Sequence, residues 1–183
     1  MILSCKQILF IVILSETFSC ATSRPCDLGA SDLLFVIQSS FDIDKYDFDD
    51  VKLLIQAYLE DLNFGDQETS TRVGVILFDR VREPEYRIRL GEIKHIRKLQ
   101  KAIKSISRLP CGYWWCQIKA EQNVAQAVDV AVKVFANESS PERMKKLVVI
   151  LNGKQYLPTI REITALSYRD PLLRVAQVLV VPG

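Results

Sequence analysis

The run from Leu33 to Ile37 constrains the fold more than any other stretch of this 183-residue chain. Its apolar residues do not alternate with polar ones, a pattern typical of a strand that is buried on both faces of a parallel sheet. A largely polar loop, Gln38 to Asp42, follows the run directly, and a long amphipathic segment comes next. In open α/β sheets, ligands bind just beyond the carboxyl ends of the strands. This loop is therefore the first place to expect a functional site.

Apolar runs typical of strands alternate with segments of helical spacing along the rest of the chain. Helices are expected at residues 48–63, 93–108, 124–135 and 158–168, and further strands at 73–78, 86–90, 147–151 and 175–181. This alternation predicts an α/β fold, a doubly covered and mostly parallel sheet. The strand at 86–90 alternates apolar with charged residues, which suits an edge position. Because the chain stops straight after a strand, the pattern suggests a domain without its last helix.

The N-terminal segment has the features of a secretory signal peptide. Lys6 precedes an apolar core, Ile8 to Leu14, that is shorter than the roughly 18 residues of a membrane-spanning helix. Ser19-Cys20-Ala21 then offers small residues at the usual cleavage spacing. We therefore expect a signal peptide at 1–21, a short segment at 22–30, one domain at 31–183, and a secreted, extracellular product without a membrane span. The alternative is a buried N-terminal strand or helix.

Three cysteines remain outside the expected signal peptide: Cys26, Cys111 and Cys116. In an oxidising compartment, Cys111 and Cys116 are close enough in sequence to close a small disulfide loop. Cys26 is then left to pair with another chain or with a segment absent from this sequence. The triplet that begins at Asn137 is a glycosylation sequon, and secretion makes its use plausible.

Basic residues crowd the helix expected at 93–108, although the net charge of the chain is only +2. They are Lys94, Arg97, Lys98, Lys101, Lys104 and Arg108. One interpretation is a solvated surface face. The other is a binding site for sulfated glycans or acidic matrix components.

Motifs that indicate catalysis are missing from the sequence. The single histidine, His95, falls in the basic helix, and no acid or nucleophile is tied to it by spacing. No glycine-rich phosphate loop follows a strand, and the cysteines lack the spacing of a zinc site. We therefore expect a protein that is not an enzyme. The net charge of +2 does not point to nucleic acid, and we expect no nucleic-acid partner.

The chain from about residue 31 to residue 183 resembles a von Willebrand factor A domain, as found in collagens, matrilins and integrins. The resemblance is carried by Asp32 to Ile37, the helical segment 48–63, Thr71 to Phe78, and Leu147 to Gly153 in that order. It implies a Rossmann-like sheet with one antiparallel edge strand.

The resemblance also implies a metal-ion-dependent adhesion site, in which two aspartates, two serines and a threonine hold Mg²⁺. Here Gln38 stands where the first aspartate belongs, Ser40 keeps the first serine, and Asp42 replaces the second serine. Asn152 replaces the aspartate of the third loop, and no threonine lies between residues 116 and 131. Since two carboxylates become amides, we expect a degenerate site that holds no Mg²⁺ and no other cofactor. Gln38, Ser40 and Asn152 then form hydrogen bonds around the end of the sheet.

The function that the resemblance implies is a metal-independent adhesion module that binds an extracellular protein, for example a matrix protein such as collagen. The candidate contact is the loop Tyr113-Trp114-Trp115 between Cys111 and Cys116, because aromatic residues dominate interface hot spots and a disulfide pre-organises a loop. Alternatively, these aromatic side chains fold back and cap the core. Two other functions stay open: an assembly unit that is disulfide-linked through Cys26, and a weak glycosaminoglycan binder that uses the basic helix.

Overall fold

A computed structural model of the chain describes residues 10–14, 30–40, 43–60, 62–65, 68–79, 82–109, 124–152 and 173–180. The strands are β1 (Phe10–Leu14), β2 (Ser31–Gln38), β3 (Thr71–Phe78), β4 (Glu85–Ile88), β5 (Met144–Asn152) and β6 (Leu173–Val180). The helices are α1 (Lys45–Glu60), α2 (Ile96–Ser105) and α3 (Val124–Glu138).

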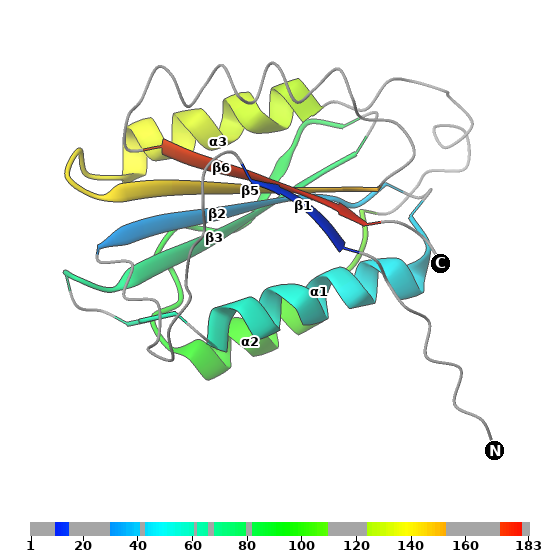
Figure 1. Ribbon diagram of the computed structural model, residues 1–183, viewed down its shortest axis with the longest axis horizontal. Coiled ribbons are helices and arrows are strands. Elements are labelled where there is room, and N and C mark those ends of the chain that lie inside the picture. Colours follow the sequence, from blue (N-terminus) through cyan, green and yellow to red (C-terminus); the bar gives the residue numbers. More distant parts are fainter. Residues whose placement is uncertain are drawn as a thin grey trace.

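The strands form one sheet in the order β1-β6-β5-β2-β3-β4. β2, β3, β5 and β6 run parallel to their neighbours in this group, and β4 pairs with β3 in the antiparallel direction at one edge. Helices α1 and α2 lie on one face of the sheet and α3 lies on the other (Figure 1). The predicted α/β fold, with its mostly parallel sheet and antiparallel edge strand, is confirmed.

β2 is the inner strand that the apolar run predicts, and all of its residues are buried. Leu33, Phe35 and Ile37 belong to the core on the α1–α2 side, and the residues between them belong to the core under α3. Gly74 of β3 leaves little room for a side chain, because a Cβ there would lie 2.6 Å from Leu34 Cδ2 and 3.2 Å from the Ile88 carbonyl oxygen. This central pair of strands sets the position of everything at the carboxyl end of the sheet.

Some element boundaries differ from the predictions for local reasons. α1 begins earlier than expected, at Lys45, because the Asp44 carboxylate accepts a hydrogen bond of 2.7 Å from the Tyr46 amide and caps the helix. α2 is shorter than expected, and Ile93 and Ile106 pack on the core from outside the helix. The helix expected at 158–168 lies outside the described residues.

A sixth strand, β1, lies at the other edge of the sheet and is also antiparallel to its neighbour. β1 pairs with β6 from Phe10↔Val180 to Leu14↔Ala176. These residues belong to the apolar core of the expected signal peptide, for which a strand was the alternative. An apolar run of this length suits either role, and the open edge of β6 offers backbone partners. A cleaved signal peptide and β1 exclude one another in the mature protein.

Candidate functional site

The carboxyl ends of β2, β3 and β5 converge at one end of the sheet, where the first predicted site residues lie. Gln38 ends β2 and is in register with Phe78 of β3, while Asn152 ends the neighbouring strand β5. The Ser39 amide donates a hydrogen bond of 2.8 Å to the Phe78 carbonyl, which continues the pairing past the strand. The topology therefore brings Gln38, Ser40 and the backbone of Asn152 to the same end, as the sequence predicts.

Gln38 and Ser40 contact each other directly, and both are buried. Gln38 Nε2 donates a hydrogen bond of 3.0 Å to Ser40 Oγ. The Ile43 amide donates to the Ser40 carbonyl at 3.1 Å and closes the turn toward α1. Between them, Ser39 Oγ is buried and has no hydrogen-bond partner within the described part of the chain. The polar end of β2 is thus closed by an amide–hydroxyl pair.

Asp79 is a carboxylate at this end that the sequence analysis did not single out. It follows β3 directly, one residue beyond Phe78, the register partner of Gln38. Its Oδ1 accepts a hydrogen bond of 2.7 Å from the Arg82 amide, and its Oδ2 lies 4.0 Å from Arg82 Nε. Its position immediately after a buried strand is the feature from which the sequence could have identified it. Among the described residues, no group of three or more His, Cys, Asp or Glu side chains is arranged to hold a metal ion.

Other predicted site residues lie outside the described residues. They are Cys26, Asp42, Cys111, Tyr113, Trp114, Trp115 and Cys116, and the side chain of Asn152 is likewise not described. Their predicted roles in the disulfide, the partner contact and the degenerate metal site stay predictions.

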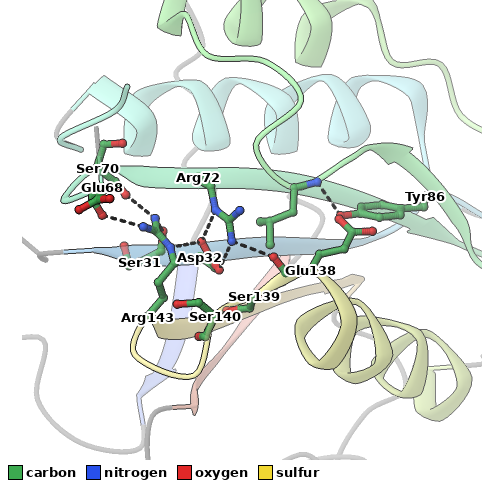
Figure 2. Close-up of polar contacts among 11 residues, drawn as sticks. Ser31, Asp32, Glu68, Ser70, Arg72, Tyr86, Glu138, Ser139, Ser140 and Arg143 are labelled. Atoms are coloured by element: carbon green, nitrogen blue, oxygen red, sulfur yellow. Dashed lines mark hydrogen bonds and ion pairs between the residues drawn. The ribbon is translucent and has the colours of Figure 1, made fainter. Parts of the chain in front are cut away.

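The opposite, amino end of the sheet carries a buried ion-pair network around Asp32 (Figure 2). Arg72 donates through Nε and Nη2 to the two Asp32 carboxylate oxygens at 2.8 and 2.6 Å. Arg143 Nε donates to Asp32 Oδ1 at 2.7 Å, and its Nη2 donates to the carbonyls of Ser31 and Ser70. Because Arg72 also donates to the Glu138 carbonyl, the network joins β2, β3, the turn before β5 and the end of α3.

The network controls the ionisation of its buried groups. Burial by itself raises the pKa of Asp32, but hydrogen bonds from Arg72, Ser139 and Arg143 outweigh it and hold this pKa below its ordinary value. Tyr86 Oη lies 3.0 Å from Glu138 Oε2 and accepts a hydrogen bond of 2.6 Å from the Leu90 amide. Burial is the main reason that the pKa of Tyr86 is raised. We call the network of Asp32, Arg72 and Arg143 the clamp. It lies at the end of the sheet away from the predicted site.

Other predicted surface residues are exposed, but Asn137 and His95 lie in different elements than expected. Asn137 is exposed in the last turn of α3, and His95 is exposed just before α2. Leu99 and Ile103 of α2 are buried, and its basic residues face solvent. In the described part of the chain, no helix has the length and apolar character needed to cross a membrane.

Comparison with known proteins identifies the family. The family model of the von Willebrand factor type A domain matches residues 32–170. The chain belongs to the von Willebrand factor type A domain family. The matched region begins at Asp32, the centre of the clamp, and contains the closed turn at Gln38 and Ser40.

Two curated human proteins are similar to this von Willebrand factor A domain. The chain is 26% identical to matrilin-4 from Homo sapiens over 151 residues, which is 82% of this chain and 23% of matrilin-4. It is 25% identical to vitrin from Homo sapiens over 143 residues, or 77% of this chain and 19% of vitrin. The chain thus spans about a fifth of the length of the curated relatives that it matches.

Solved structures share the fold. The chain resembles proximal thread matrix protein 1 from the mussel byssus, with a zinc-occupied metal-ion-dependent adhesion motif, at a TM-score of 0.57 and 15% identity. The match covers 94% of this chain and 37% of that chain. The von Willebrand factor A domain of SpRpn10 matches at a TM-score of 0.50 and 10% identity, over 77% of this chain and 71% of that one. Together with the relatives, the family supports an adhesion or protein-binding module.

Proposed function

We propose that this von Willebrand factor A domain is a secreted, extracellular module that binds a matrix protein without a metal ion. The observation that carries the proposal is the hydrogen bond of 3.0 Å from Gln38 Nε2 to Ser40 Oγ. In the family pattern, these two positions supply a carboxylate and a hydroxyl to Mg²⁺. Here a neutral amide donates to that hydroxyl, so the hydroxyl oxygen is already engaged within the protein.

The chemistry of the donor set argues against a cation at this position. Mg²⁺ dehydrates reluctantly and is bound through charged oxygen ligands. Gln38 and Asn152 have no charge with which to offset that dehydration, and burial of Gln38 increases the energetic cost of placing a cation beside it. Zinc occupies the motif of the mussel protein, but this chain departs from the motif at both amide positions. Contact with a partner then falls to other residues of the domain.

The loop Tyr113-Trp114-Trp115 between Cys111 and Cys116 is the proposed partner contact. Large aromatic side chains provide most of the binding energy in many interfaces. In Trp114→Ala with Trp115→Ala, we expect binding to immobilised fibrillar collagen in EDTA-containing buffer to fall about tenfold or more. The melting temperature should stay nearly unchanged, because the proposed role is contact with a partner.

A matched control for this experiment is Tyr46→Ala. Tyr46 is also an aromatic residue, is 77% exposed, and lies on α1. It should leave collagen binding unchanged. A large fall in melting temperature of the tryptophan variant would instead support aromatic side chains that cap the core, and unchanged binding would contradict the proposal.

Secretion is tested by the N-terminus of the protein recovered from the medium of a mammalian cell line. We expect it to begin near residue 22 and to lose mass on treatment with a peptide N-glycosidase, since Asn137 is exposed. Its sheet then lacks β1, and β6 loses its antiparallel neighbour. Recovery of the protein with its first residues intact, and only inside the cells, would contradict secretion.

A further inference from the structure

A pocket of about 500 Å³ opens between the first two turns of α1 and the segment at the end of α2. Its charged lining residues are four cations and one carboxylate: Lys45, Lys52, Lys104, Arg108 and Asp49. Phe48, Ile106 and Leu109 add apolar surface to the lining. The pocket is therefore a positively charged hollow formed by two elements that are far apart in the sequence.

The single carboxylate of the pocket is already paired. Lys52 Nζ lies 2.7 Å from Asp49 Oδ1, and it also donates to the carbonyls of Lys104 and Ile106 at 3.2 Å each. Lys52 thus neutralises Asp49 and satisfies the carbonyls at the end of α2. Arg108 donates to the Ile43 carbonyl at 2.6 Å, which fixes its guanidinium at the pocket. Lys45 and Lys104 are exposed, so the pocket presents an excess of positive charge.

The basic face of α2 leads into this pocket. Arg97, Lys98, Lys101 and Lys104 are exposed on the side of α2 opposite Leu99 and Ile103. Residues 93–109 include no aspartate or glutamate. No carboxylate of the described residues forms an ion pair with these four side chains. We call the four the basic strip; it ends at Lys104, which also lines the pocket.

The acidic residues described near the start of α1, other than Asp49, do not line the pocket. Asp44 caps the helix through the Tyr46 amide. Asp47 and Asp50 are on the other side of the helix from Lys45 and Lys52, because 3.6 residues complete one turn. Positive charge therefore dominates the side of α1 that faces the pocket.

We propose that the basic strip and the pocket together bind a sulfated glycan chain, with an anionic group of the glycan seated among Lys45, Lys104 and Arg108. The proposal rests on the extracellular location given above. A sulfated glycan fits better than an acidic protein segment, because protein interfaces rely on buried aromatic and apolar anchors. The large apolar side chains exposed in the described part of the chain, Tyr46 and Leu53, are both on α1 and not on the strip.

The test is titration calorimetry of the secreted protein with a size-defined heparin oligosaccharide. In Lys45→Ser with Lys104→Ser, we expect the affinity to fall about tenfold, because two converging charges are lost. The matched control, Lys133→Ser with Arg87→Ser, removes the same charge at exposed positions on α3 and β4. It should keep the affinity within about twofold of the original, since neither residue lines the pocket or belongs to the basic strip.

Three outcomes would overturn the proposal. Equal losses in both variants would show a response to net charge alone. Equal binding of fully desulfated heparin would exclude recognition of sulfate. Equal or tighter binding of polyglutamate, or of single-stranded DNA of matched charge, would assign the strip to an acidic protein or to a general polyanion. Collagen binding in EDTA should be unchanged in the pocket variant, so a failure here is distinguishable from a failure of the proposed protein contact.

Discussion

Asp32→Ala is expected to lower the free energy of unfolding by about 3–5 kcal/mol, because removing one partner of a buried ion pair leaves the other charge uncompensated. Asp32 is fully buried, and its two carboxylate oxygens accept hydrogen bonds from both Arg72 and Arg143. Without the carboxylate, two guanidinium groups lose their counter-ion. The backbone contacts of Arg143 with Ser31 and Ser70 then lose their anchor. Urea denaturation followed by circular dichroism measures the change.

Asp49→Ala is the matched control for this variant. Asp49 is also ion-paired, at 2.7 Å from Lys52, but its side chain is 44% exposed. Exposed pairs contribute little, so we expect a loss of less than about 1 kcal/mol. If Asp32→Ala lowers the free energy of unfolding by no more than the control does, the clamp does not stabilise the fold as proposed.

The effect of Asp32 has a defined pH dependence. Its folded-state pKa lies below the ordinary 3.8, so its stabilising contribution is present above that pH and disappears as pH falls through the folded-state value. The difference in free energy of unfolding between the original protein and Asp32→Asn should therefore be constant near neutral pH. It should become smaller as the pH falls through the folded-state pKa of Asp32.

Lys146→Met is expected to change stability in the opposite direction, by about 1–3 kcal/mol in favour of the folded state. Lys146 is 4% exposed in β5, and its Nζ has no hydrogen-bond partner among the described residues. Alternation along the strand places it on the same face as Val148 and Ile150. Burial lowers the pKa of this amine to about 8, so the charged form destabilises the fold. Methionine has a similar length without the charge.

The size of this effect also depends on pH. The penalty of the buried ammonium is complete below about pH 8 and fades as pH rises toward the ordinary value of 10.5. The advantage of Lys146→Met should shrink over that range in thermal melts. Lys133→Met, at an exposed position of α3, should change stability by less than about 0.5 kcal/mol at any of these pH values. A destabilised Lys146→Met variant would show that the amine has a favourable partner.

The architecture could be predicted because it follows from local patterns. The unbroken run from Leu33 to Ile37 predicted a central strand, and the alternation around Tyr86 and Ile88 predicted the edge strand β4. Local pattern did not predict β1, since Phe10 to Leu14 has the same composition in a signal peptide and in a strand. Likewise, Lys146 precedes the apolar run of β5, and only the pairing of β5 with β2 from Ser31 onward includes it in the sheet.

One of the two polar sites could be predicted from the sequence, and the other could not. The order of strands was enough to place Gln38, Ser40 and Asn152 at one end of the sheet, because parallel strands end at the same edge. The clamp was not predictable, since Arg72 and Arg143 lie far from Asp32 in sequence and meet it only through the pairing of the sheet. The basic helix was visible in the sequence. The pocket at its end depends on how α1 packs beside α2.

Metal-free binding is the central claim, and calorimetric titration of the secreted, EDTA-treated protein with Mg²⁺, Mn²⁺ and Zn²⁺ tests it most directly. The Gln38–Ser40 pair predicts no saturable binding of these ions in the micromolar range. Collagen binding should then be equal in EDTA and in Mg²⁺. Micromolar binding of one metal ion that is lost in Asp42→Ala would contradict the account, because it would show that a working cation site survives at the end of β2.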